Sequence, residues 1–255
     1  DGMRDGNVLG FDSVPQPTYK DKDLRKAVAL EKAKAQDETE VFANDSKKKI
    51  YMHWMYDVPM GEQLDDDGDS LESIEGCLTD AQYNRDEHRK AVIDDILDNW
   101  VSQSHNGKFH AILATSSIPE AIKYYKLFAQ RDCGLKTTAV FDPSDGNNES
   151  SIEKIDGIAQ MLEDYNSLFG TCFNISGYAS FKRDVCARLA HKTPYTAVEN
   201  EPSKCLDILI VVDQMLTGYD SKWLNTLYMD KFYKWSNIEM IIQAFSRTNR
   251  VFNDD

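Results

Sequence analysis

Apolar residues gather in four short runs along the second half of the chain. The runs cover residues 108–115, 136–141, 207–213 and 225–230. Apolar runs of this length, set off by polar or turn-forming residues, are typical of buried β-strands. We therefore predict four strands in this region.

Helical periodicity marks the segments around these strands. Within residues 86–103, apolar residues from Val92 to Trp100 recur at the spacing of one helix face. Further helices are predicted at residues 116–129, 151–169, 178–191 and 237–247. Strands that alternate with helices form a parallel sheet with helices on both faces, which is an α/β fold. Ligands of such folds bind at the carboxyl ends of the strands.

The first third of the chain has weaker patterns. Residues 7–11 are a strand candidate, and residues 21–42, rich in Ala, Glu, Lys and Leu, predict an exposed helix. Residues 44–83 predict a loop-rich connector, in which we expect Trp54 and Tyr56 to pack onto another part of the protein. The domain division expected from these patterns is a connector over residues 1–85 and a folded domain over residues 86–255.

Composition limits the class of protein. In 255 residues, 41% are hydrophobic, which allows a sizeable core. The longest apolar runs are far shorter than the roughly 20 residues of a membrane span, and the first residues do not resemble a signal peptide. We expect a soluble, cytoplasmic protein. The cysteines and histidines show no Cys-x-x-Cys pair and no two histidines four positions apart, so no metal site is predicted.

The net charge of −14 disfavours a nucleic-acid partner, because phosphate neutralisation requires lysine and arginine. The charge is uneven, since the stretch from Asp57 to Asp80 contains no lysine or arginine. A solvated acidic loop explains this stretch better than a cation site. Any DNA-binding surface is therefore expected to be local.

Two loops at the carboxyl ends of the predicted strands have residues that suit phosphate. Thr115, Ser116 and Ser117 precede a predicted helix, whose free amides and dipole attract anions. The alternative is that these residues only cap the helix. Thr217 and Gly218 offer a hydroxyl and an unobstructed amide, although a tight turn explains the glycine equally well.

Arg247 and Arg250 stand three positions apart at the end of the last predicted helix. Two such guanidinium groups can converge on one anion and stabilise a transferring phosphoryl group. The alternative is a surface pair that complements the helix dipole.

The order of these segments resembles motifs IV, V and VI in the second RecA-like domain of superfamily 2 helicases and translocases. The sequence DILIVVDQMLTGYDSKWLNTLYMDK, followed by IIQAFSRTNRV, resembles that of the motor (R) subunit of type I restriction-modification endonucleases. The likeness is close over residues 108–251 and looser before them. It implies a RecA-like, P-loop NTPase-type parallel sheet, preceded by a linker.

The resemblance also implies roles for individual residues. Arg247 and Arg250 match the motif VI arginine fingers, and Gln243 and Asp220 match residues that face the nucleotide. A further set matches the positions that contact the DNA backbone, namely Thr115, Ser116, Ser117, Thr217 and Gly218. One departure is that Ser246 and Asn249 stand where many helicases have glycine.

Several motifs of the complete enzyme are absent from this sequence, among them the Walker A loop, a strand-borne Asp-Glu pair and the nuclease centre. The resemblance therefore implies that ATP and Mg²⁺ bind mainly to a first RecA-like domain, and that this chain is an inactive piece of a larger motor. The implied partners are double-stranded DNA, the other domains of the subunit, and methyltransferase and specificity subunits. Alternatives are the corresponding lobe of another superfamily 2 motor, or a non-catalytic Rossmann-like interaction module.

Overall fold

The computed structural model describes residues 14, 20–61, 63, 71–78, 85–131, 133–141, 151–212 and 221–230. The chain divides into two compact units, one of residues 14–92 and one of residues 93–255 together with residues 1–13, and each is considered by itself. The strand predicted at residues 7–11 and the helix predicted at residues 237–247 lie outside the described residues.

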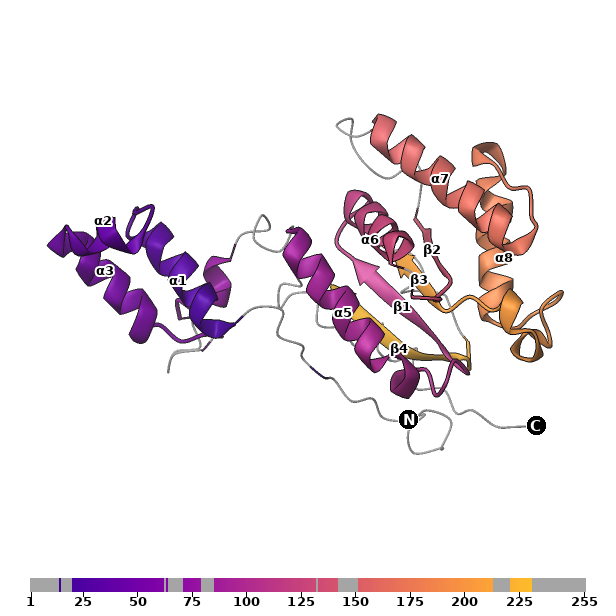
Figure 1. Ribbon diagram of the computed structural model, residues 1–255, viewed down its shortest axis with the longest axis horizontal. Coiled ribbons are helices and arrows are strands. Elements are labelled where there is room, and N and C mark those ends of the chain that lie inside the picture. The colour runs from indigo at the N-terminus through magenta and orange to yellow at the C-terminus, as the bar shows by residue number, and fades with distance from the viewer. Residues whose placement is uncertain are drawn as a thin grey trace. The chain divides into compact units, whose positions relative to one another are not determined.

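The second unit contains a parallel sheet of four strands (Figure 1). Its strands are β1 (His110–Thr115), β2 (Thr137–Val140), β3 (Ile208–Val211) and β4 (Leu224–Asp230). Their order across the sheet is β2-β3-β1-β4, and every neighbouring pair is parallel. All four strands occur where the apolar runs predict them.

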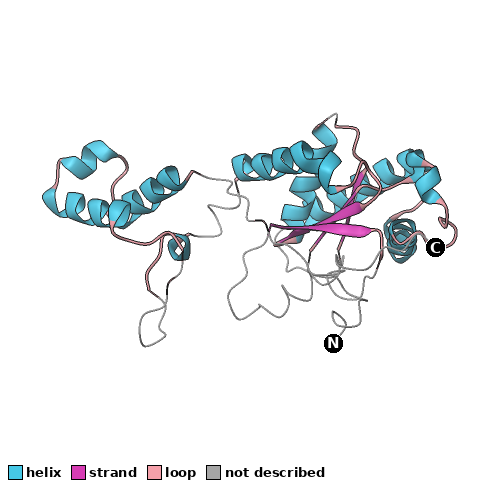
Figure 2. Ribbon diagram, turned by 90° about the horizontal axis from the view of Figure 1, so that it is seen from below, coloured by secondary structure: helices cyan, strands magenta, loops and turns pink. Residues whose placement is uncertain are grey.

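Helices surround this sheet (Figures 1 and 2). They are α5 (Asp86–Gln103), α6 (Ile118–Gln130), α7 (Ser151–Phe169) and α8 (Tyr178–Leu189), with short 3₁₀ turns η2 (Ile175–Gly177), η3 (Val198–Asn200) and η4 (Pro202–Lys204). Every residue of β1 and β3 is buried, so both faces of the central strands are covered. The predicted α/β fold is confirmed, and the parallel sheet agrees with a RecA-like domain.

The first unit is helical, and here two sequence predictions are wrong. It contains α1 (Asp21–Lys32), α2 (Glu38–Phe42), α3 (Asp45–Tyr56) and the 3₁₀ turn η1 (Glu75–Cys77). The single helix predicted over residues 21–42 is two helices, because Lys34 takes a left-handed φ of 51° and Asp37 caps α2 by accepting from the amide of Glu40 at 2.9 Å.

The predicted loop-rich connector begins with a helix instead. Asn44 caps α3 by accepting from the amides of Ser46 and Lys47 at 2.9 and 3.2 Å. Of the two aromatic residues expected to pack, Trp54 is buried, whereas Tyr56 is 71% exposed. The helix is stable here because its apolar face packs against other helices.

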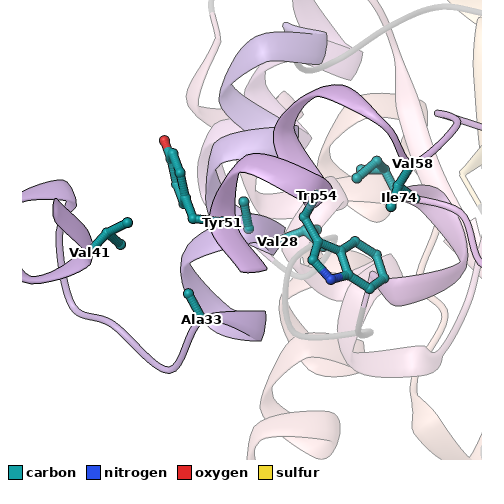
Figure 3. Close-up of a cluster of buried hydrophobic side chains, with 8 residues drawn as sticks. Val28, Ala33, Val41, Tyr51, Trp54, Val58 and Ile74 are labelled. Carbon is teal, nitrogen blue, oxygen red and sulfur yellow. The ribbon is translucent and has the colours of Figure 1, made fainter. Parts of the chain in front are cut away.

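A small hydrophobic core holds this helical unit together (Figure 3). It joins Val28 of α1, Val41 of α2 and Trp54 of α3, and Lys32 lies over the Trp54 ring at 4.4 Å. Glu38 adds a polar tie, since it accepts from Lys26 at 2.6 Å and from the Tyr51 hydroxyl at 2.7 Å.

Replacing Trp54 should therefore destabilise this unit. We expect Trp54→Ala to lower its free energy of unfolding by about 3–5 kcal/mol, because a large buried side chain is lost. Tyr56→Ala, at an exposed position of the same helix, should change it by less than about 0.5 kcal/mol. Hydrogen exchange of the α1 and α3 amides measures both, and equal protection in the two variants would contradict the role of Trp54.

Candidate functional site

The carboxyl ends of β1, β3 and β4 meet at one edge of the sheet. Ala114 of β1 is in register with Val211 of β3, and Thr115 of β1 is in register with Asp230 of β4. The three strands therefore end at the same level. This edge is the one at which the sequence predicts a ligand site.

Thr115, the first of the predicted phosphate-contacting residues, is fully buried. Its hydroxyl donates to the carbonyl of Val211 at 3.1 Å, and the carbonyl of Ser117 lies at 3.4 Å. The side chain thus links the ends of β1 and β3 instead of facing solvent.

Ser116 and Ser117 have different surroundings. Ser117 is the N-cap of α6, and its hydroxyl accepts from the amide of Glu120 at 3.4 Å, with Pro119 in the first turn. Ser116 is exposed. Ser117 therefore caps the helix, as the alternative interpretation expects. Ser116 is exposed to solvent at the start of a helix whose dipole attracts anions.

The other predicted site residues lie outside the described residues. They are Thr217, Gly218, Asp220, Gln243, Arg247 and Arg250. Val211 and Asp230, which the structure does describe, stand six residues before Thr217 and 17 residues before Arg247 in the sequence. The roles expected for the six residues stay predictions.

Asp230 is a residue of this edge that the sequence analysis missed. Its carboxylate oxygen Oδ2 accepts a hydrogen bond from the hydroxyl of Tyr124 on α6 at 2.5 Å. Tyr124 is fully buried. A carboxylate at the end of an apolar strand was the available signal, but nothing in the sequence indicates its partner.

The opposite, amino-terminal edge of the sheet has a hollow of about 590 Å³, lined among others by His110, Lys136, Asp207 and Trp223. Lys136 donates its amide to Asp207 Oδ2 at 2.7 Å and its ammonium group to the carbonyl of Pro202 at 2.7 Å. Burial raises the pKa of Asp207. The charged groups of Lys136 and Asp207 therefore both have hydrogen-bond partners.

A buried arginine borders the same hollow. Arg188 donates to the hydroxyls of Tyr165 and Tyr195 at 3.1 and 2.9 Å and to the carbonyl of Lys204 at 2.8 Å. Its guanidinium group also lies 3.8 Å from the centre of the Phe169 ring. These contacts join α7 and α8 to the segment before β3, which is a structural role.

Within the described part of the chain, no group of histidine, cysteine, aspartate and glutamate side chains is arranged to hold a metal ion. None of the described helices has the length and apolar character needed to cross a membrane.

The family model and the relatives that match this chain all come from type I restriction enzymes. The family model for domain 3 of the type I restriction enzyme subunit R matches residues 107–255. The endonuclease subunit of the type I enzyme SsaAORF53P of Staphylococcus saprophyticus is 32% identical over 199 residues, which are 74% of this chain and 20% of that protein.

Two further relatives have the same description. The endonuclease subunit of SauMRSORF196P from Staphylococcus aureus is 28% identical over 98% of this chain and 22% of its own length. That of HindI from Haemophilus influenzae is 44% identical over 52 residues, 20% of this chain and 5% of its own. The chain thus spans about a fifth of the length of the first two relatives.

The buried histidine at the amino edge makes stability depend on pH. Burial, reinforced by His191, lowers the pKa of His110 to about 3. In the unfolded chain the imidazole takes up a proton as the pH falls through about 6.5, whereas in the folded chain it stays neutral. Unfolding therefore takes up a proton, and the free energy of unfolding decreases as the pH falls. From pH 7 to pH 5, this group alone lowers the free energy of unfolding by about 2 kcal/mol.

We therefore expect the free energy of unfolding of His110→Gln to fall by about 2 kcal/mol less than that of the wild type between pH 7 and pH 5. Urea unfolding at the two pH values measures the difference, and His53→Gln, at an exposed position, controls for histidine replacement itself. The same loss in His110→Gln as in the wild type would contradict the assignment.

Proposed function

The chain belongs to the type I restriction enzyme R subunit family, and on this basis we propose that it forms the second RecA-like domain of an ATP-dependent double-stranded DNA translocase. The observation that carries the proposal is the common carboxyl edge of β1, β3 and β4. In the sequence, the segments that follow β1, β3 and β4 contain the residues that resemble motifs IV, V and VI.

In the proposed mechanism, this domain supplies one wall of the ATP cleft. Arg247 and Arg250 act as arginine fingers on the γ-phosphate, where two guanidinium groups stabilise the charge of the transferring phosphoryl group. Gln243 and Asp220 contact the nucleotide. Hydrolysis then opens and closes the cleft against the first RecA-like domain.

The DNA side of the proposed mechanism uses neutral donors. Ser116, Thr217 and Gly218 hold phosphate oxygens through hydroxyl and amide groups. Thr115 and Ser117 support this loop through the strand and the helix cap described above. The proposed partners are double-stranded DNA, the first RecA-like and nuclease domains of the subunit, and methyltransferase and specificity subunits.

The residues described here do not fit a magnesium site, since they contain no suitable cluster of ligands. The sequence also has no Walker A loop. We therefore propose that Mg²⁺ and most contacts to ATP belong to the first RecA-like domain, and no step of the mechanism is assigned to the metal in this chain.

The arginine-finger role predicts a large loss of turnover. In the full-length subunit, Arg247→Ala or Arg250→Ala should lower the rate of DNA-dependent ATP hydrolysis by about 10³-fold or more, the scale of an arginine finger. Binding of ATP should change much less, because the interaction is strongest in the transition state. Steady-state hydrolysis and equilibrium binding of a nucleotide analogue measure the two quantities.

Arg183→Ala is a suitable control for these variants. Arg183 is on α8, and the contact described for it is to Ser180 on the same helix at 3.1 Å. This variant should hydrolyse ATP at the wild-type rate. Near-normal hydrolysis in Arg247→Ala and Arg250→Ala would refute the finger role.

A second prediction follows because the proposal assigns the phosphate-binding loop to another domain of the subunit. The purified 255-residue chain should show no ATP hydrolysis, with or without double-stranded DNA, because it has no phosphate-binding loop. A phosphate-release assay on the purified chain tests this. Turnover that disappears in Arg250→Ala would show that the chain is active without a second domain and would contradict the proposal.

A further inference from the structure

Two adjacent tyrosines of α6 make the same contact with different elements. The Tyr124 hydroxyl donates to Oδ2 of Asp230 at 2.5 Å, and the Tyr125 hydroxyl donates to Oδ2 of Asp164 at 2.5 Å. Both rings are buried, with 0% and 5% of their surface exposed. Tyr124 thereby ties α6 to the end of β4, whereas Tyr125 ties α6 to α7.

The Tyr124 contact lies at the carboxyl edge of the sheet. Asp230 is the last residue of β4 and is in register with Thr115. From Thr115 the chain continues through Ser116 and the cap Ser117 into α6, which carries Tyr124. The hydrogen bond therefore closes a ring that runs from the end of β1, through the serine loop and the first turns of α6, to the end of β4.

This ring is stiff for identifiable reasons. A hydroxyl that donates to a carboxylate makes a stronger and more directional bond than one that donates to a neutral acceptor. Tyr124 sits on a regular helix in close-packed surroundings, so its hydroxyl has little freedom to follow a different position of Asp230. The orientation of the β4 end is thus fixed relative to the serine loop.

We propose that Tyr124 is a positioning residue of the motor, which holds the end of β4, through Asp230, in a fixed place relative to the Ser116–Ser117 loop. The segment that follows Asp230 in the sequence contains Gln243, Arg247 and Arg250. The bond therefore fixes the strand end from which this segment continues in the sequence. The inference rests on the proposed function.

The adjacent tyrosine makes a sharp test possible. In the full-length subunit, Tyr124→Phe and Tyr125→Phe each remove one hydroxyl and, with it, the 2.5 Å hydrogen bond to a carboxylate described above. A merely structural role predicts similar effects of both on thermal unfolding and on activity. A positioning role predicts that only Tyr124→Phe affects the chemical step.

We expect Tyr124→Phe to lower kcat for ATP hydrolysis with saturating double-stranded DNA by about 10- to 100-fold, because small misplacements of catalytic groups have effects of this size. The KM for ATP should be unchanged, since the lost positioning acts on the transition state. Tyr125→Phe should keep the wild-type kcat although its melting temperature falls by a similar amount.

Substitutions of Asp230 separate positioning from direct participation. Asp230→Asn keeps an oxygen that accepts from the Tyr124 hydroxyl and should retain most of the rate, whereas Asp230→Ala should behave like Tyr124→Phe. Loss of turnover in Asp230→Asn together with normal turnover in Tyr124→Phe would overturn the inference, because the carboxylate would then act by itself.

Failure of the inference and failure of the proposed function give different results. A wild-type subunit without DNA-dependent ATP hydrolysis would overturn the proposed function, and the inference with it. An active subunit in which Tyr124→Phe and Tyr125→Phe have equal kcat would overturn the inference alone.

Discussion

The pairing of β1 with β3 on one side and with β4 on the other is the constraint on which the rest of the domain depends. β1 is buried at every position, so its backbone amides and carbonyls must find partners in the two neighbouring strands. The resulting register ends all three strands at one level, and the Thr115 hydroxyl adds a bond to Val211. Segments about 100 residues apart in the sequence are thereby brought to one edge.

The central strands β1 and β3 could be predicted because they are apolar at consecutive positions, as in Ile208–Val211. Only a strand covered on both faces tolerates this pattern. The helical unit was harder to predict, because α3 begins with the polar residues DSKKK, which show no apolar periodicity. The helix is stabilised by the buried side chains of Tyr51 and Trp54. The energy that forms this helix comes from packing against Val28 and Val41, and tertiary contacts of this kind override local propensity.

The edge that carries the candidate site could also be predicted from the sequence, because the carboxyl ends of parallel strands lie at the same edge of the sheet. The pairing of Tyr124 with Asp230 did not, since it joins residues 106 positions apart. On an amphipathic helix a tyrosine is indistinguishable from an ordinary core residue until its hydroxyl has a partner. The hollow at the amino edge was equally hidden, because the residues before all four strands contribute to it.

Charge limits how this domain would act on DNA under the proposed function. A chain of net charge −14 repels phosphates, and salt confines this repulsion to distances within about 8 Å. The residues proposed to meet the backbone are hydroxyls and amides, which release no counterions and therefore add little salt-dependent affinity. Under the proposed function, such contacts would fix the position of the duplex while adding little to the affinity for DNA, and tight binding to DNA would come from other parts of the subunit.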